Sequence, residues 1–150
     1  MLAEVPRCVV ASPALLAQFP PVNTPEDLLV LPWIAISTFY QRHVDLFDGL
    51  SMQPRRIAIT PRLSTDSLHV ARNTVLTGLG VAVVSSWTVK EDIREGRLIH
   101  LLPEWQPAAL PVHLVYPWSR YYPARLRRFL EMMKQVMPDI AGMRKPVSEQ

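Results

Sequence analysis

Few side chains in this sequence have the type and spacing that catalysis or metal binding requires. The four histidines are far apart in the sequence, and only one cysteine accompanies them: His43, His69, His100, His113 and Cys8. Metal sites need Cys and His ligands at short, regular spacings, so no metal centre is expected. Cys8 lies in the apolar run CVVA, which is typical of a small buried side chain rather than a nucleophile.

Two motifs that would indicate an enzyme are incomplete. No G-x-S-x-G elbow surrounds Ser85 or Ser86, so neither serine is predicted to be a nucleophile. Gly78-Leu79-Gly80 follows a predicted helix and precedes a predicted strand. A dinucleotide-binding loop has the opposite order and a third glycine, where this chain has Val83. The sequence therefore predicts a protein that is not an enzyme and has no cofactor.

Two pairs of adjacent carboxylates have a structural interpretation. Glu26-Asp27 and Glu91-Asp92 are each predicted to lie in the first turn of a helix. Acids are favoured there because the helix macrodipole places positive charge at the N-terminus. Neither pair is predicted to perform acid–base chemistry.

Hydroxyl groups at predicted helix starts are the best candidates for ligand binding. Ser12, Thr24 and Ser64-Thr65 each precede a helix, where free N–H groups can hold a carboxylate or phosphate. Ligands of open α/β sheets bind at the carboxyl ends of strands, and we expect Ser12 and Ser64-Thr65 to lie there together. The alternative, that these hydroxyls only cap their own helices, stays open.

The elements that position these residues alternate between strands and helices. Strands are predicted at 7–11, 33–37, 55–60, 81–85, 97–102 and 111–116. Helices are predicted at 13–19, 25–31, 66–77, 89–96 and 123–137, of which the fourth begins with a Thr88/Glu91 capping box. The short second helix should bury Leu28, Leu29 and Leu31. Between 38 and 54 the pattern is ambiguous, although Phe39, Val44, Leu46 and Phe47 suit a loosely amphipathic helix.

The composition is that of one folded domain. The chain has 150 residues, of which 49% are apolar and 19% charged, and a net charge of +3. This is enough apolar material for a core, and the scattered basic residues favour a solvated surface over a nucleic-acid footprint. No signal peptide or membrane-spanning segment is expected, so the predicted location is the cytoplasm. The alternation of elements predicts an α/β fold with a mostly parallel sheet.

A series of short motifs, in this order, resembles the effector-binding domain of LysR-type transcriptional regulators. The motifs are VVASPALLAQF, Thr24-Pro25-Glu26-Asp27-Leu28, Gly78-Leu79-Gly80-Val81-Ala82, Glu91-Asp92-Ile93 with Gly96-Arg97-Leu98, Leu102-Pro103, Val115-Tyr116-Pro117 and Arg125 to Phe129. The family domain has two lobes like those of type 2 periplasmic binding proteins. The resemblance covers about 7–137.

The resemblance implies a nearly whole but incomplete second lobe at about 11–111. A remnant of the first lobe would occupy about 112–137, followed by a flexible tail at 138–150. The helix-turn-helix arm that binds DNA in such regulators is expected to be absent from this chain, so no direct DNA contact is expected. The last helix would lose its packing surface and expose its apolar face, which invites a partner.

The family implies a small organic-acid effector held between the lobes. Carried over by residue, the expected effector-binding residues are Ser12, Leu63, Ser64, Thr65 and Asp66. Ser64 and Thr65 would donate hydrogen bonds and Leu63 would supply apolar contact. Asp66 would cap its helix or orient a neighbour. A homo-oligomer, or pairing with related regulator subunits, is the expected assembly.

Two other functions stay open. The first is a protein interaction module that pairs with intact LysR-type regulators. The second is a stand-alone periplasmic-type binding protein or enzyme, which the lack of an export signal and of catalytic residues disfavours.

Overall fold

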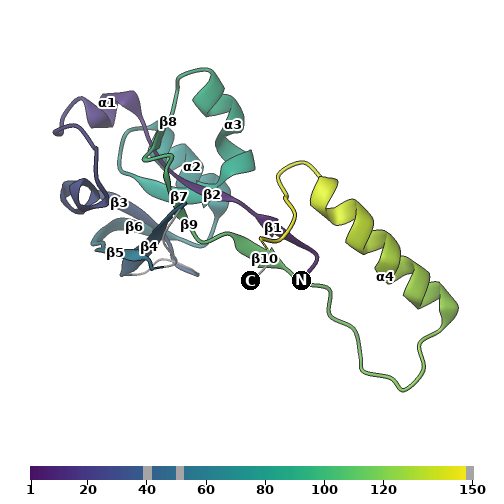
Figure 1. The fold of residues 1–150 in the computed structure, drawn as a ribbon. Coiled ribbons are helices and arrows are strands. Elements are labelled where there is room, and N and C mark those ends of the chain that lie inside the picture. Colours follow the sequence, from purple (N-terminus) through teal and green to yellow (C-terminus); the bar gives the residue numbers. More distant parts are fainter. Residues whose placement is uncertain (39–41, 50–52, 148–150) are drawn as a thin grey trace. The chain divides into compact units, whose positions relative to one another are not determined.

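The fold was analysed in a computed structural model that describes residues 1–38, 42–49 and 53–147. The chain forms two compact units (Figure 1). The larger is Arg7–Ala108, and the smaller combines Met1–Pro6 with Ala109–Gln150. The candidate site lies in the larger unit.

The larger unit is built on a mixed sheet with strand order β6-β3-β7-β2-β8. The strands are β2 (Arg7–Ala11), β3 (Trp33–Ile36), β6 (Pro61–Thr65), β7 (Ala82–Ser85) and β8 (Ile99–Leu101). Backbone bonds of 2.8 Å join β3 to the start of β7, from Ile34 N to Val81 O and from Val81 N to Pro32 O. β3 pairs with β6 in parallel, whereas β2 runs antiparallel to β7 and β8. The predicted α/β fold is confirmed, but the sheet is mixed rather than mostly parallel, because β2 enters it antiparallel to both of its neighbours.

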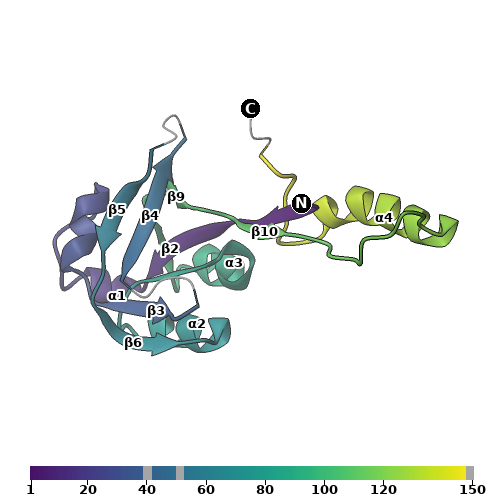
Figure 2. The same ribbon diagram turned by 90° about the horizontal axis from the view of Figure 1, so that it is seen from below.

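Both faces of this sheet are buried, and alternate residues of each central strand enter different cores. Val9 of β2 enters one core with Leu28, Trp33 and Val83, while Val10 enters the other with Val75. Such apolar runs, buried on both sides, are typical of covered parallel sheets. Helices α2 (Leu68–Leu76) and α3 (Ser86–Arg94) supply the second core. The first core lies against an antiparallel sheet of β5 (Arg55–Ala58), β4 (His43–Asp48) and β9 (Trp105–Pro107) (Figure 2).

The segment between 38 and 54 contains a strand, so the predicted amphipathic helix is wrong there. In β4, Val44 and Leu46 are both buried in the first core. They lie two residues apart, which is the periodicity of a strand. Phe39 lies outside the described residues. The short helix at 25–31 is a 3₁₀ helix, η1 (Pro25–Val30), and Leu29 is exposed, whereas Leu28 and Leu31 are buried.

Helix starts also differ from those predicted. Ser67, not Ser64, Thr65 or Asp66, is the N-cap of α2, since the Ser67 hydroxyl accepts the N–H of Val70. α3 begins three residues before the predicted start, with Ser85 as its N-cap, so Thr88 lies inside the helix. α1 (Pro13–Leu16) ends before the predicted Phe19. Each hydroxyl competes with nearby ones for the same role, and sequence alone does not rank them.

The smaller unit pairs the two ends of the chain. β1 (Ala3–Val5) runs antiparallel to β10 (Leu110–Val112), which is shorter than the predicted strand 111–116. The last helix, α4 (Ala124–Val136), is followed by η2 (Met137–Asp139), and none of the residues of α4 is buried. Arg144, in the predicted flexible tail, exchanges backbone hydrogen bonds with Glu4 and forms an ion pair with its carboxylate at 3.2 Å.

In the described part of the chain, no helix has both the length and the apolar character needed to cross a membrane.

The Glu91-Asp92 pair is not explained by a first helix turn, because both residues lie in the second half of α3. Asp92 is fully buried and accepts from Arg72 Nε at 2.6 Å, Arg72 Nη2 at 2.8 Å and Arg97 Nη2 at 2.8 Å. The Arg72 guanidinium holds the pKa of Asp92 below its ordinary value against the opposing effect of burial, and Arg97 adds to the lowering. This carboxylate therefore ties α2, α3 and the turn after α3 together.

Replacing Asp92 with Asn should lower the free energy of unfolding by roughly 3 kcal/mol, because it breaks a buried ion pair. The lowered pKa means that the carboxylate stabilises the fold above its unfolded-state pKa and stops doing so as pH falls through the folded value. The difference from wild type should therefore shrink below about pH 4, as measured by urea unfolding at several pH values. The Arg56–Asp45 pair gives the control, since Arg56 is exposed and Asp45 only half-buried, so that Asp45→Asn should cost less than about 1 kcal/mol. Equal losses for the two variants would contradict this role of Asp92.

Gly80 is required by a close backbone approach at the start of β7. A Cβ there would lie 2.9 Å from the carbonyl oxygen of Pro32 and 3.1 Å from the Ile34 side chain. The carbonyl cannot yield, because it accepts the N–H of Val81. Gly80→Ala should therefore destabilise the fold by about 1–3 kcal/mol in urea unfolding. Gly49→Ala, where a Cβ would meet nothing within 4 Å, should change stability by less than about 0.5 kcal/mol. If Gly80→Ala left the free energy of unfolding unchanged, the β3–β7 junction would be able to relax and the prediction would be wrong.

Candidate functional site

The candidate site is the carboxyl edge, which we define as the ends of the parallel strands β6, β3 and β7. The parallel registers place Thr65, Ser37 and Ser85 in a row at the ends of these three strands. Arg7, at the start of β2, pairs with Ser85 of β7. A backbone bond of 2.9 Å from Ser37 N to Thr65 O holds the row together. Three hydroxyls and one guanidinium therefore reach this edge from four strands. By strand alternation Ser37, Ser85 and Arg7 follow the face of the first core, whereas Thr65 follows the helix face.

Two helices begin at the carboxyl edge. α2 follows β6 after a turn in which Thr65 Oγ1 accepts the N–H of Ser67 at 3.1 Å. α3 follows β7 directly. The N-cap of α3, Ser85, is buried and makes no side-chain hydrogen bond to the helix N-terminus. The first N–H groups of α3 therefore have no intrahelical acceptor and point along the positive end of the helix dipole.

The expected effector-binding residues 63–66 do not share one face of the sheet. Leu63 and Thr65 pair with Ile34 and Ile36, which face the helices, whereas Ser64 pairs with Ala35, which faces the other core. Leu63 and Ser64 are exposed, and Thr65 is half-buried. Asp66 is exposed immediately beyond the strand. Successive side chains of a strand point to opposite faces, so Ser64 does not share a face with Thr65.

Ser12 is at the opposite edge of the sheet, so the expectation that it lies beside Ser64-Thr65 is wrong. It follows the end of β2, but β2 runs antiparallel to its neighbours, and its end therefore lies beside the start of β7. Five residues of strand at about 3.3 Å each separate the two edges by roughly 15 Å. Ser12 is buried, and its hydroxyl accepts the N–H of Leu15 at 3.2 Å as the cap of α1.

Arg7, Ser37 and Ser85 are residues of the carboxyl edge that the sequence did not single out. Each ends or begins a strand that was predicted correctly, but their proximity depends on strand order. Arg7 Nε donates to the carbonyl oxygen of Ala108 at 2.6 Å, which fixes the base of its guanidinium. The only signal that could have found them was the register across β2 and β3, which no local pattern contains.

Burial shifts the pKa of two titratable side chains in the larger unit. Burial raises the pKa of the Cys8 thiol, and a hydrogen bond with Ser86 offsets part of that effect. Burial lowers the pKa of His100, opposed by the charge of Glu104. In the described ranges, no group of three or more His, Cys, Asp or Glu side chains could hold a metal ion.

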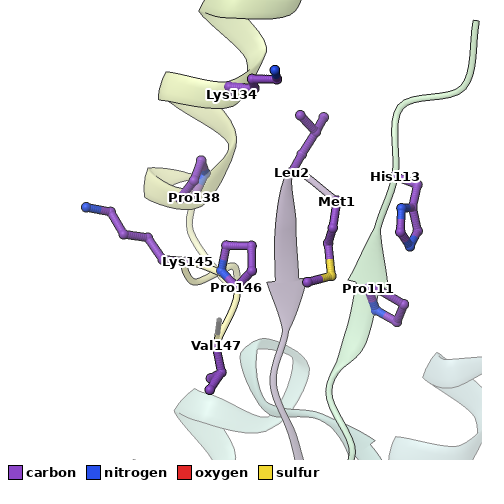
Figure 3. A pocket seen from close by; sticks show the side chains of 9 residues that line it. All are labelled: Met1, Leu2, Pro111, His113, Lys134, Pro138, Lys145, Pro146 and Val147. Carbon is purple, nitrogen blue, oxygen red and sulfur yellow. The ribbon is translucent and has the colours of Figure 1, made fainter. Parts of the chain in front are cut away.

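The smaller unit has a hollow of about 750 Å³ with a mainly apolar wall of Met1, Leu2 and several prolines. Figure 3 shows that the side chain of Lys145 points away from Met1 and Leu2. The charged groups of this hollow do not converge, so it offers a ligand no defined polar anchor.

The comparisons with known proteins agree with this architecture. The family model for the LysR substrate binding domain matches residues 1–138. The HTH-type transcriptional regulator PtxR of Pseudomonas aeruginosa is 34% identical over 137 residues, which are 89% of this chain and 43% of PtxR. The chain thus spans less than half the length of this curated relative.

Solved structures show the same fold. Full-length AphB, the virulence activator of Vibrio cholerae, matches with a TM-score of 0.70 at 20% identity, covering 90% of this chain and 46% of AphB. The regulatory domain of CrgA from Neisseria meningitidis matches with a TM-score of 0.58 at 26% identity, covering 90% of this chain and 66% of that domain. The strand order, the family match and these likenesses agree, and the chain belongs to the LysR substrate-binding domain family.

Proposed function

We propose that this chain is the effector-sensing portion of a LysR-type transcriptional regulator and that its effector is a small organic acid bound at the carboxyl edge. The observation that carries the proposal is the uncapped N-terminus of α3, which lies in the same row as Thr65, Ser37 and Arg7. An uncapped helix N-terminus favours an anion. The hydroxyls supply directional hydrogen bonds, and the guanidinium adds positive charge.

The two helix starts at this edge differ in a way that supports one anion rather than two. The Ser67 hydroxyl caps α2 by accepting the N–H of Val70, so part of that N-terminus is satisfied internally. At α3 the Ser85 side chain makes no such bond. A carboxylate oxygen is the natural acceptor for the remaining N–H groups of α3.

The other residues at this edge have supporting roles in the proposed site. Thr65 donates its hydroxyl to the ligand, and Leu63, on the same face, supplies apolar contact. Ser64 acts through its backbone, since its side chain is on the other face. Asp66 repels an anion and so orients it toward α3. Ser12, at the far edge, does not touch this ligand.

In a complete regulator, binding would favour one arrangement of the lobes and so bias the oligomer and its geometry on DNA. The DNA contact itself would come from outside this chain. PtxR and several other curated relatives are named as regulators of transcription, which supports a sensor rather than an enzyme. A regulator of this kind acts in the cytoplasm on chromosomal DNA.

The proposal is tested by thermal unfolding of the purified chain with a set of small carboxylates. An effector present at about 100 times its dissociation constant should raise the melting temperature by roughly 5–10 °C. Thr65→Ala should weaken binding of that effector about tenfold or less, because one hydrogen bond to a charged group is lost. Thr77→Ala is the matched control, since Thr77 is exposed at the other end of α2 and its hydroxyl donates to Thr74 O at 2.7 Å. A set in which no carboxylate stabilises the wild-type chain would count against an organic-acid effector.

A second candidate function is pairing with another regulator subunit. All 13 residues of α4 remain unburied, including Phe129, which is 44% exposed. An apolar helix face of this size favours a protein partner. Sedimentation that finds only monomer at all concentrations, alone and with an intact related regulator, would rule this pairing out.

A further inference from the structure

A hollow of about 530 Å³ opens on the larger unit at the edge opposite the carboxyl edge. The start of α1, the last turn of α2 and the turn after α3 form its wall. Arg72 and Arg97 line it together with Ser12, and none of the described residues that line it is acidic. We infer that this hollow is a second anion-binding site, which takes a small carboxylate with a short apolar body.

The two arginines are held in place before any ligand arrives. Both donate to the carboxylate of Asp92, which is fully buried, so one anion is shared by two cations. Glu95 also pairs with Arg97 at 3.0 Å, and its side chain is 47% exposed. The two arginines therefore face two carboxylates, and they offer the hollow fixed N–H donors rather than an excess of charge. Folding has already ordered these donors, so a ligand does not have to immobilise them.

The two guanidinium groups have more N–H donors than their contacts with Asp92, Asn73 and Glu95 use. Each carries five N–H groups. Arg72 uses Nε and Nη2 on Asp92 and reaches Asn73 through Nη1 at 3.3 Å, while Arg97 uses Nη2 and Nη1. These contacts involve three of the five N–H groups of Arg72 and two of those of Arg97, so each guanidinium has further N–H groups to offer a ligand. A carboxylate that spans the two arginines would use these donors.

The rest of the wall suits the body of such a ligand. Pro13, Ala14 and Leu76 are apolar, and a Cβ on Gly96 would meet nothing within 4 Å, so the approach on that side is open. The Ser12 hydroxyl accepts the N–H of Leu15 and retains its own proton to donate. The site is roughly 15 Å from the carboxyl edge, so it is independent of the proposed effector site.

The test uses the full chain labelled with ¹⁵N and benzoate as the probe, with benzamide as its neutral counterpart. Benzoate should shift the amide resonances of Ala14, Leu76 and Gly96, and benzamide should not. Arg97→Gln, which leaves the Arg72–Asp92 pair intact, should weaken benzoate binding about tenfold or more. Arg94→Gln is the control, since Arg94 is an exposed cation at the end of the same helix that pairs with Glu91.

Thermal unfolding of both variants checks that each is folded. The inference is overturned if benzoate shifts none of these amides, if benzamide shifts them equally, or if Arg97→Gln binds as wild type does. Shifts confined to Ser37, Thr65 and Thr88 would support the carboxyl edge and reject this second site. Shifts at the hollow without shifts at the carboxyl edge would support this second site. The proposed effector site would then be decided separately, by the thermal unfolding of the chain with the set of carboxylates.

Discussion

The antiparallel insertion of β2 between β7 and β8 is the constraint on which the rest of this structure depends. It pairs Val9 and Val10 with both neighbours and sends their side chains into different cores. It also determines which strand ends meet, because the end of β2 lies at the edge where the parallel strands begin. Ser12 is therefore separated from Thr65, and Arg7, at the start of β2, is placed beside Ser85.

Charge is used differently at the two edges of the sheet. At the carboxyl edge, backbone N–H groups of α3 and hydroxyls provide polarity without a neutralising acid in the row itself. At the opposite edge, Asp92 is buried beneath two arginines and fixes them. A buried carboxylate is tolerated only when it is paired and hydrogen-bonded. The same pairing that makes Asp92 compatible with the core therefore orients Arg72 and Arg97 toward solvent.

The smaller unit has little buried apolar core, unlike the larger unit. Its two short strands and one amphipathic helix bury little, since no residue of α4 is buried. Small units bury a smaller fraction of their surface on folding than large ones do, so their stability is marginal. The backbone and ion-pair contacts between Glu4 and Arg144 hold its ends together, but they do not replace a core.

The sequence by itself determined the class of fold and most of its elements, because local signals are strong there. The apolar runs at β2 and β7, the positive-φ Gly78 that ends α2 and the spacing of α4 are readable without tertiary contacts. The same signals placed Thr65 near a helix start. They did not distinguish Ser67 from its neighbouring hydroxyls as the cap, and they read the alternation of β4 as a helix. Only the tertiary structure decided which strand ends share an edge and that Asp92 is buried, because strand order and direction depend on contacts between residues distant in the chain.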